Sequence, residues 1–273
     1  MSAGVDASSL ITRGGCRRAG ARLLSWVTME SPHGAHAHDP ELQVAINRAL
    51  GRNDSTPVSP DDARSVTRLD LQSTGVRDLS PLAAMTGLVT LDLSDTRVSD
   101  LAPLAGLTRL RTLLLVDTLV TDLTPLTGLT NMRVLYLSEN RVSDLAPLSG
   151  MTALRTLSVW RTNVSDVTVL SGLSSMKKLD LTNTSVSDLT PLAAMTNLVD
   201  LNLDYTNVRD LTPLAGCTQL AALSLYNTLV TDLGPLAAIT SLRSLRLARS
   251  TTPSDLTPLA GLANLEMQYL GRA

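Results

Sequence analysis

Apolar and polar residues alternate along this chain in a unit that returns every 22 residues. In the copy that begins at Leu88, the apolar Leu91 and Leu93 alternate with the polar Thr90 and Asp92. This period of two predicts a short strand with one buried face. The copies begin at Val66, Leu88, Leu110, Met132, Leu154, Met176, Leu198, Leu220 and Leu242. A fixed period of this length is typical of a solenoid, because one unit cannot bury its leucines without stacked neighbours.

The second half of each unit predicts a short helical turn. In the same copy it reads Asp100-Leu101-Ala102-Pro103-Leu104, which is too short for a long α-helix. Asp100 suits an N-cap, since its carboxylate accepts backbone N–H groups of the first turn, and proline is tolerated in that turn. We therefore expect a 3₁₀ or single-turn helix in each coil.

The whole unit reads L-x-x-L-x-L-x-x-T-x-V-x-D-L-x-P-L-x-x-L-T-x and recurs nine times. It resembles the leucine-rich repeat, and its V-x-D-L-x-P-L part is similar to the bacterial internalin subclass. The resemblance covers about Asp39 to Leu270. It implies an α/β solenoid in which a curved parallel β-sheet is backed by short 3₁₀ turns on the convex side, with a helical cap at the N-terminal end.

One position departs from the family pattern. Most such repeats carry Asn where this chain mostly carries Thr, and only Asn140 fits. A threonine hydroxyl can still bond to the backbone of the turn, more weakly. The threonines are Thr74, Thr96, Thr118, Thr162, Thr184, Thr206 and Thr228.

The chain divides into four predicted segments. Residues 1–38 form a disordered basic tail, 39–65 a helical N-terminal cap, 66–264 the nine repeats and 265–273 a C-terminal partial repeat. The cap is needed because the first repeat would otherwise expose an apolar face. Its helix presents one apolar stripe, formed by Leu42, Ala45, Ile46, Ala49 and Leu50.

The tail leaves localisation open. Its apolar stretch Leu23-Leu24-Ser25-Trp26-Val27 is too short for a signal-peptide core or a membrane span. We expect either a plain tail or an amphipathic targeting segment. The protein is accordingly expected in the cytoplasm, or outside the cell by an export route without a recognisable signal peptide.

Composition limits the chemistry available to the chain. Phe is absent and the formal net charge is −2, so the core is expected to be aliphatic and a nucleic-acid partner is not expected. Cys217 occupies a core position and Cys16 lies in the tail, which argues against a disulfide scaffold. His33, His36 and His38 have a spacing that suits a transition metal, or they belong to a polar linker.

The repeats offer little for catalysis. They contain no histidine to act as a base beside a nucleophile. Their regularly spaced aspartates are better explained as turn residues than as a metal ladder, because a catalytic pair needs two different environments. We therefore expect no enzyme activity, no cofactor, no metal site in the repeats and no small-molecule substrate.

The outward positions of the strands are better suited to binding. Four of the six aromatic residues fall on them, and Tyr, Trp and Arg dominate interface hot spots. The same side chains could instead reflect strand propensity and cross-strand packing alone. The predicted partner-binding residues are Leu114, Val116, Val134, Tyr136, Trp160, Arg161, Lys178, Asp204, Tyr205, Tyr226 and Arg246.

The sequence thus predicts a non-enzymatic module that holds a protein partner against a concave sheet. The alternative is a recognition or scaffold subunit of a larger effector or ligase system, whose catalytic part lies on another chain and docks through residues 1–38.

Overall fold

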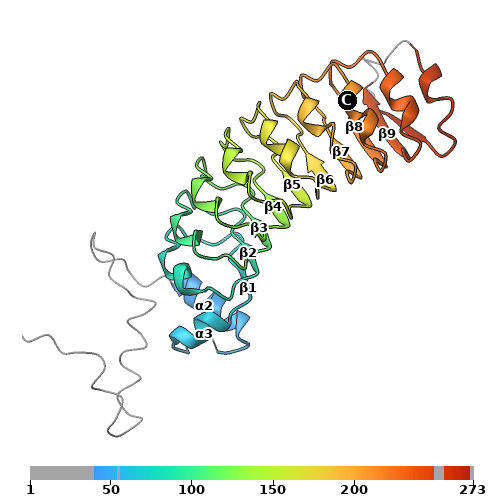
Figure 1. Ribbon diagram of the computed structural model, residues 1–273. Coiled ribbons are helices and arrows are strands. Elements are labelled where there is room, and N and C mark those ends of the chain that lie inside the picture. The colour runs from blue at the N-terminus through green and yellow to red at the C-terminus, as the bar shows by residue number, and fades with distance from the viewer. Residues whose placement is uncertain (1–39, 54–55, 249–254, 271–273) are drawn as a thin grey trace, which may run out of the picture.

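The computed structural model describes residues 40–53, 56–248 and 255–270, and the predicted tail and its histidines lie outside them. Figure 1 shows a curved stack of coils with α2 and α3 at one end and β9 near the other. Ten strands form one parallel sheet in sequence order, which confirms the predicted solenoid. The strands are β1 (Arg68–Asp70), β2 (Thr90–Asp92), β3 (Thr112–Leu114), β4 (Val134–Tyr136), β5 (Thr156–Ser158), β6 (Lys178–Asp180), β7 (Asp200–Asn202), β8 (Ala222–Leu225), β9 (Ser244–Ala248) and β10 (Glu266–Leu270).

The register of the sheet follows from the repeat. Leu91 of β2 pairs with Leu113 of β3, so equivalent positions of successive coils lie side by side. Leu113 and Leu115 are buried, whereas the side chains of Thr112 and Leu114 are only half-buried on the other face. Leucine therefore stacks on leucine through the whole solenoid, and each buried side chain contributes roughly 1.5–3 kcal/mol before conformational entropy is subtracted.

A 3₁₀ segment lies opposite the strand in each coil (Figure 1). Val169 stands where the other coils carry proline, and the 3₁₀ segment of its coil still forms. The segments are η2 (Ser80–Ala84), η3 (Ala102–Leu104), η4 (Thr124–Leu126), η5 (Ala146–Leu148), η6 (Thr168–Gly172), η7 (Thr190–Leu192), η8 (Thr212–Gly216), η9 (Gly234–Ala238) and η11 (Thr257–Leu259).

The predicted N-cap role of the aspartates needs a correction. The cap residue of η3 is Leu101, which makes no side-chain cap bond. Asp100 lies one residue earlier, and its Oδ1 accepts the backbone N–H of Ala102 at 2.8 Å. The carboxylate thus closes an Asx turn that leads into the 3₁₀ segment. The same contact recurs at Asp78, Asp122, Asp144, Asp166, Asp188, Asp210, Asp232 and Asp255.

The threonines replace asparagine as predicted, with fewer bonds. In six coils the hydroxyl donates to the carbonyl three residues earlier, at 2.6–3.0 Å. The Thr118 hydroxyl lies 3.3 Å from the corresponding carbonyl of Leu115. Asn140 does more, because its amide donates to Leu137 in its own coil and to Leu115 in the preceding coil. Its Oδ1 also accepts from the Thr118 hydroxyl at 2.7 Å. Asparagine therefore ties two coils together where threonine closes a turn within one.

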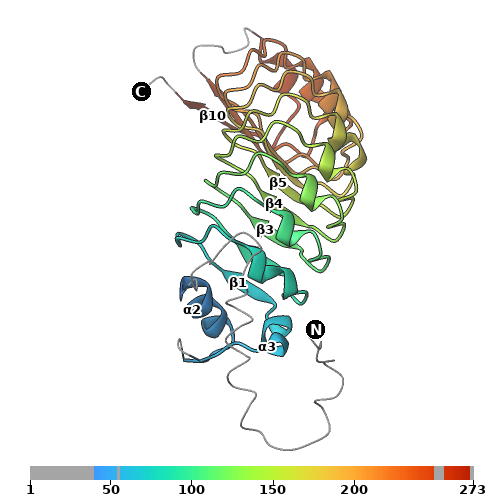
Figure 2. The same cartoon turned by 90° about the vertical axis from the view of Figure 1, so that its left-hand side faces the viewer.

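Two helices, α2 (Pro40–Ala49) and α3 (Pro60–Ser65), cover the N-terminal end of the sheet beside β1 (Figure 2). Gly51 has φ +66 at the end of α2, a conformation that glycine adopts without strain.

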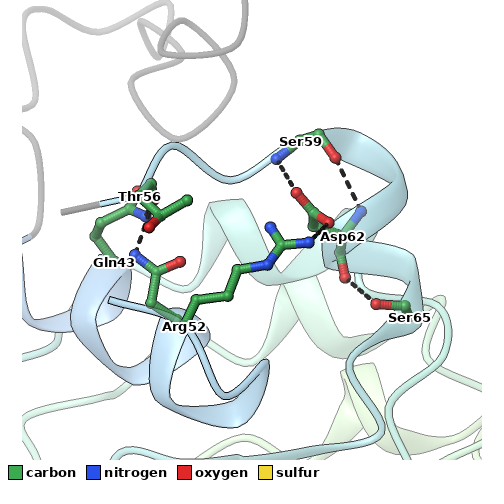
Figure 3. A network of polar contacts seen from close by, with 7 residues as sticks. Gln43, Arg52, Thr56, Ser59, Asp62 and Ser65 are labelled. Atoms are coloured by element: carbon green, nitrogen blue, oxygen red, sulfur yellow. Dashed lines mark hydrogen bonds and ion pairs between the residues drawn. The ribbon is translucent and has the colours of Figure 1, made fainter. Parts of the chain in front are cut away.

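Side-chain contacts join described residues on either side of the connection between the two helices (Figure 3). Ser59 and Asp62 form a capping box at the start of α3. Arg52 pairs with Asp62 at 2.5 Å, and this contact holds the pKa of the Asp62 carboxyl well below its usual value. The Gln43 amide donates to the Thr56 carbonyl.

Candidate functional site

The predicted residues lie on the strands of the concave face or in the turns that directly follow them. Leu114, Val116, Val134, Tyr136 and Trp160, which we call the apolar patch, come from three successive coils. Leu114 and Tyr136 are partners in the sheet register. Tyr136 is 37% exposed, and the other four side chains are half-buried rather than turned into the core.

Trp160 and Arg161 are joined at one border of the apolar patch. The guanidinium carbon of Arg161 lies 5.6 Å from the centre of the Trp160 ring. The same guanidinium pairs with Glu139 of the preceding coil at 2.9 Å. Both members of the ion pair are partly exposed, so the pair contributes orientation more than stability.

A second group, the Tyr226 cluster, is formed by Asp204, Tyr205, Ser224, Tyr226 and Arg246. The Asp204 carboxylate accepts the Ser224 hydroxyl and the backbone N–H of Tyr226, and it pairs with Arg246 at 3.3 Å. The Tyr205 and Tyr226 rings meet edge-on with centroids 5.3 Å apart. Arg246 lies 5.3 Å from the centre of the Tyr226 ring. Five side chains from three coils are therefore held as one unit.

Burial separates the roles within the Tyr226 cluster. Tyr205 is 49% exposed, whereas Asp204 is 4% exposed. The sequence predicts that Asp204 contacts a partner; in the structure its carboxylate is buried and holds Ser224, Tyr226 and Arg246. Its carboxylate already has a partner at each oxygen. The pKa of the Tyr205 hydroxyl is raised, first by its hydrogen bond with the Tyr226 side chain and then by desolvation.

The predicted residues do not form one continuous cluster. Thr182 occupies the coil between Trp160 and Asp204, and its hydroxyl donates to Asp180. Lys178 belongs to neither group and approaches Asp200 at 3.9 Å. The concave face thus carries an apolar patch and a Tyr226 cluster, with a polar coil between them.

The eighth position of the coils has a left-handed backbone. Asn183 and Asn227 suit it, whereas Arg161 (φ +54) and Tyr205 (φ +56) are bulky residues in a conformation that costs them roughly 1 kcal/mol. Residues in such strained conformations cluster at functional sites. The residues with positive φ here are Ser73, Asp95, Asp117, Glu139, Arg161, Asn183, Tyr205 and Asn227.

The described part of the chain offers no group of three or more His, Cys, Asp or Glu side chains placed to hold a metal ion. Cys217 is buried, which raises the pKa of its thiol. Within the described ranges, every helix falls short of the length and apolarity needed to cross a membrane.

Comparisons with known proteins agree with this architecture. A family of leucine-rich repeats (2 copies) matches residues 108–150 and 130–175. The crystal structure of an internalin (InlF) from Listeria monocytogenes is similar at 30% sequence identity and a TM-score of 0.72, over 85% of this chain and 75% of that chain. This chain belongs to the internalin-like leucine-rich-repeat proteins.

Two further structures are similar to this internalin-like protein. Internalin C2 from Listeria monocytogenes has 28% identity and a TM-score of 0.63, over 85% of this chain and 93% of that chain. A leucine-rich-repeat protein of Leptospira interrogans has a TM-score of 0.69 at 18% identity, over 77% of this chain and 57% of that chain, and supports the fold alone. No curated protein matches the chain. Leucine-rich-repeat proteins are typically protein-interaction modules and are generally non-catalytic.

Sequence reasoning missed the connections between the site residues of this internalin-like protein. It did not pair Glu139 with Arg161 or place Asp204 beneath Tyr226. The signal was available, because residues 22 apart are neighbours in the sheet: Glu139 with Arg161, and Asp204 with Tyr226. A charged residue whose 22-residue neighbour has the opposite charge is an expected pair.

Proposed function

We propose that this protein is a non-enzymatic module that binds a protein partner on its concave sheet. The observation that carries the proposal is the placement of the rings. Tyr136 lies on β4, and Trp160, Tyr205 and Tyr226 lie in the turns after β5, β7 and β8, outside the aliphatic core. Packing of the interior therefore does not require them. Aromatic side chains of this kind are the usual anchors of a protein interface.

The apolar patch serves as the anchor in this proposal, and the charged residues around it select the partner. Arg161 is stacked on Trp160 and fixed by Glu139, so little side-chain freedom is lost when a partner contacts it. The Tyr226 cluster is likewise held in place before binding by the buried Asp204. Lys178 contributes a separate charge nearer the start of the strands.

The test is a quantitative affinity purification from the native source with three baits. The wild type is compared with a Tyr136→Ala/Trp160→Ala variant and with a matched Leu119→Ala/Leu229→Ala variant. The two leucines of the control are exposed apolar residues in the outer turns, 59% and 39% exposed. We expect specific partners to be lost from the first variant and kept by the control. Partners retained by all three baits would overturn the assigned face.

The alternative is a recognition or scaffold subunit of a larger system. It differs from the first proposal because residues 1–38 would dock the catalytic chain. The test deletes this segment and checks by thermal melting that the repeats stay folded. The alternative would be favoured if the shortened protein no longer recruited a catalytic chain but still bound its partner on the concave face.

A further inference from the structure

A row of basic residues follows the edge of the sheet where the strands begin. Arg111, Arg133, Arg155 and Lys177 each directly precede a strand, from β3 to β6. Their backbones are joined in series, because the N–H groups of Arg133, Arg155 and Lys177 each donate to the carbonyl of the preceding member at 2.8 Å. Arg109 and Lys178 flank the series, and all six side chains are exposed. We call these six residues the basic row.

The stretches of chain that carry the basic row contain no acidic residue, and the carboxylates of the same coils follow only after the strands begin. Asp and Glu are absent from residues 101–116, 123–138, 145–160 and 167–179. Among the ion pairs of the described residues, the row takes part only through Lys178 and Asp200, at 3.9 Å between exposed groups. Neighbouring coils are about 4.8 Å apart, well within the screening length of about 8 Å at physiological salt. The cations therefore repel one another in the free protein, and an aligned anionic surface would relieve that repulsion.

The basic row borders the apolar patch. Arg111 shares its coil with Leu114, Arg133 directly precedes Val134, and Arg155 shares its coil with Trp160. A partner seated on the apolar patch would therefore bring its own rim against these cations. Protein interfaces commonly combine an apolar centre with a polar rim, and complementary rim charges speed association.

We propose that the basic row forms one rim of the binding surface and that the protein partner carries a row of carboxylates beside its apolar contact patch. This inference rests on the proposed function and adds the partner's chemistry to it. A polypeptide fits better than a nucleic acid, because Asp70, Asp92, Asp95 and Asp117 line the sheet before and beside the same coils. These carboxylates would repel a phosphate backbone that extended along the face.

The test measures binding of a labelled oligoglutamate peptide by fluorescence anisotropy. We expect binding that weakens as salt is raised, and an Arg133→Ser/Arg155→Ser variant that binds about tenfold more weakly, or about 0.7 kcal/mol for each charge removed. The matched control is Arg97→Ser/Arg141→Ser, which removes two exposed arginines of the same charge from the turns after the strands. Equal loss in both variants, or none in either, would contradict the proposal, and melting curves verify that each variant is folded.

Two further measurements decide between occupants. Tighter binding of an oligothymidylate than of oligoglutamate would overturn the choice of a polypeptide. The aspartates of the Asx turns follow the same period as the basic row, so a second copy of the chain is the other occupant to test. Sedimentation velocity at low salt tests whether the protein associates with itself. Self-association of the wild type that is lost in the Arg133→Ser/Arg155→Ser variant would assign the basic row to contacts between copies and overturn the proposal.

The failure of this inference differs from the failure of the proposed function. A Tyr136→Ala/Trp160→Ala variant should keep oligoglutamate binding, since the peptide lacks apolar side chains. Captured partners that need Tyr136 and Trp160 but not Arg133 and Arg155 would refute the rim alone. Captured partners that need the arginines but not the rings would refute the apolar anchor.

Discussion

The convex turns and the concave face of this solenoid are built from the same unit and use it differently. In the turns, an Asx contact of 2.7–2.8 Å recurs from Asp78 to Asp255 with almost no change of partner geometry. On the concave face, the position of Asp92 in one coil is held by Leu114 and Tyr136 in the next two. Regular positions maintain the stack, and irregular ones are free to carry a binding surface.

The largest effect should separate a core residue from its concave neighbour in one strand. Leu135→Ala removes a buried leucine and should lower the free energy of unfolding by about 2–5 kcal/mol. Tyr136→Ala, one residue further, removes an exposed ring and should change it by less than about 1 kcal/mol. Denaturant unfolding of both variants measures the difference. Equal losses would mean that the Tyr136 ring belongs to the core.

The second test compares the single asparagine with a threonine at the same position. Asn140→Ala leaves buried carbonyls in two coils without their donor and should destabilise by about 1–3 kcal/mol. Thr184→Ala removes one hydroxyl bond within a coil and should cost about 0.5–1.5 kcal/mol. Chemical denaturation of the pair provides the measurement. If Thr184→Ala lowered the free energy of unfolding as much as Asn140→Ala does, the contacts that Asn140 makes between coils would add nothing to stability.

A smaller effect, of opposite sign, is expected at the left-handed positions. Arg161→Asn places a residue that tolerates positive φ and should stabilise the fold by up to about 1 kcal/mol, while it removes the exposed pair with Glu139. Binding of a captured partner should weaken in the same variant. Thermal melting and an affinity measurement are made on one preparation. A variant that is less stable than the wild type and binds the partner with equal affinity would show that Arg161 is not part of the site.

The smallest effect concerns the titration of a turn carboxylate at acidic pH. The pKa of the Asp188 carboxyl is lowered, first by the Thr190 hydroxyl and then by the Thr190 backbone N–H. A carboxylate with a lowered pKa stabilises the fold above its unfolded pKa of about 3.9, and that contribution is lost as the pH falls through the folded value. Thr190→Ala should therefore raise the Asp188 pKa, and Thr190→Ser should preserve it. An NMR titration of the carboxyl carbon measures both, and an unchanged value in Thr190→Ala would exclude the hydroxyl as the cause.

Much of the fold could be predicted from the repeat, because a coil that exposes Leu91 and Leu93 on one face has few ways to bury them. The outward direction of Tyr136 and Trp160 followed from the same alternation. The burial of Asp204 could not be predicted from periodicity, since it depends on Ser224, Tyr226 and Arg246 from two later coils. The series from Arg111 to Lys177 could not be predicted from the alternation within the strands, because each of its residues comes one position before a strand begins.

The most direct test of the concave binding surface is hydroxyl-radical footprinting of the protein, free and in complex with a captured partner. We expect the rings of Tyr136, Trp160, Tyr205 and Tyr226 to become protected on binding, with Leu119 and Leu229 in the outer turns unchanged. Rings that stay as reactive in the complex as in the free protein would contradict the account.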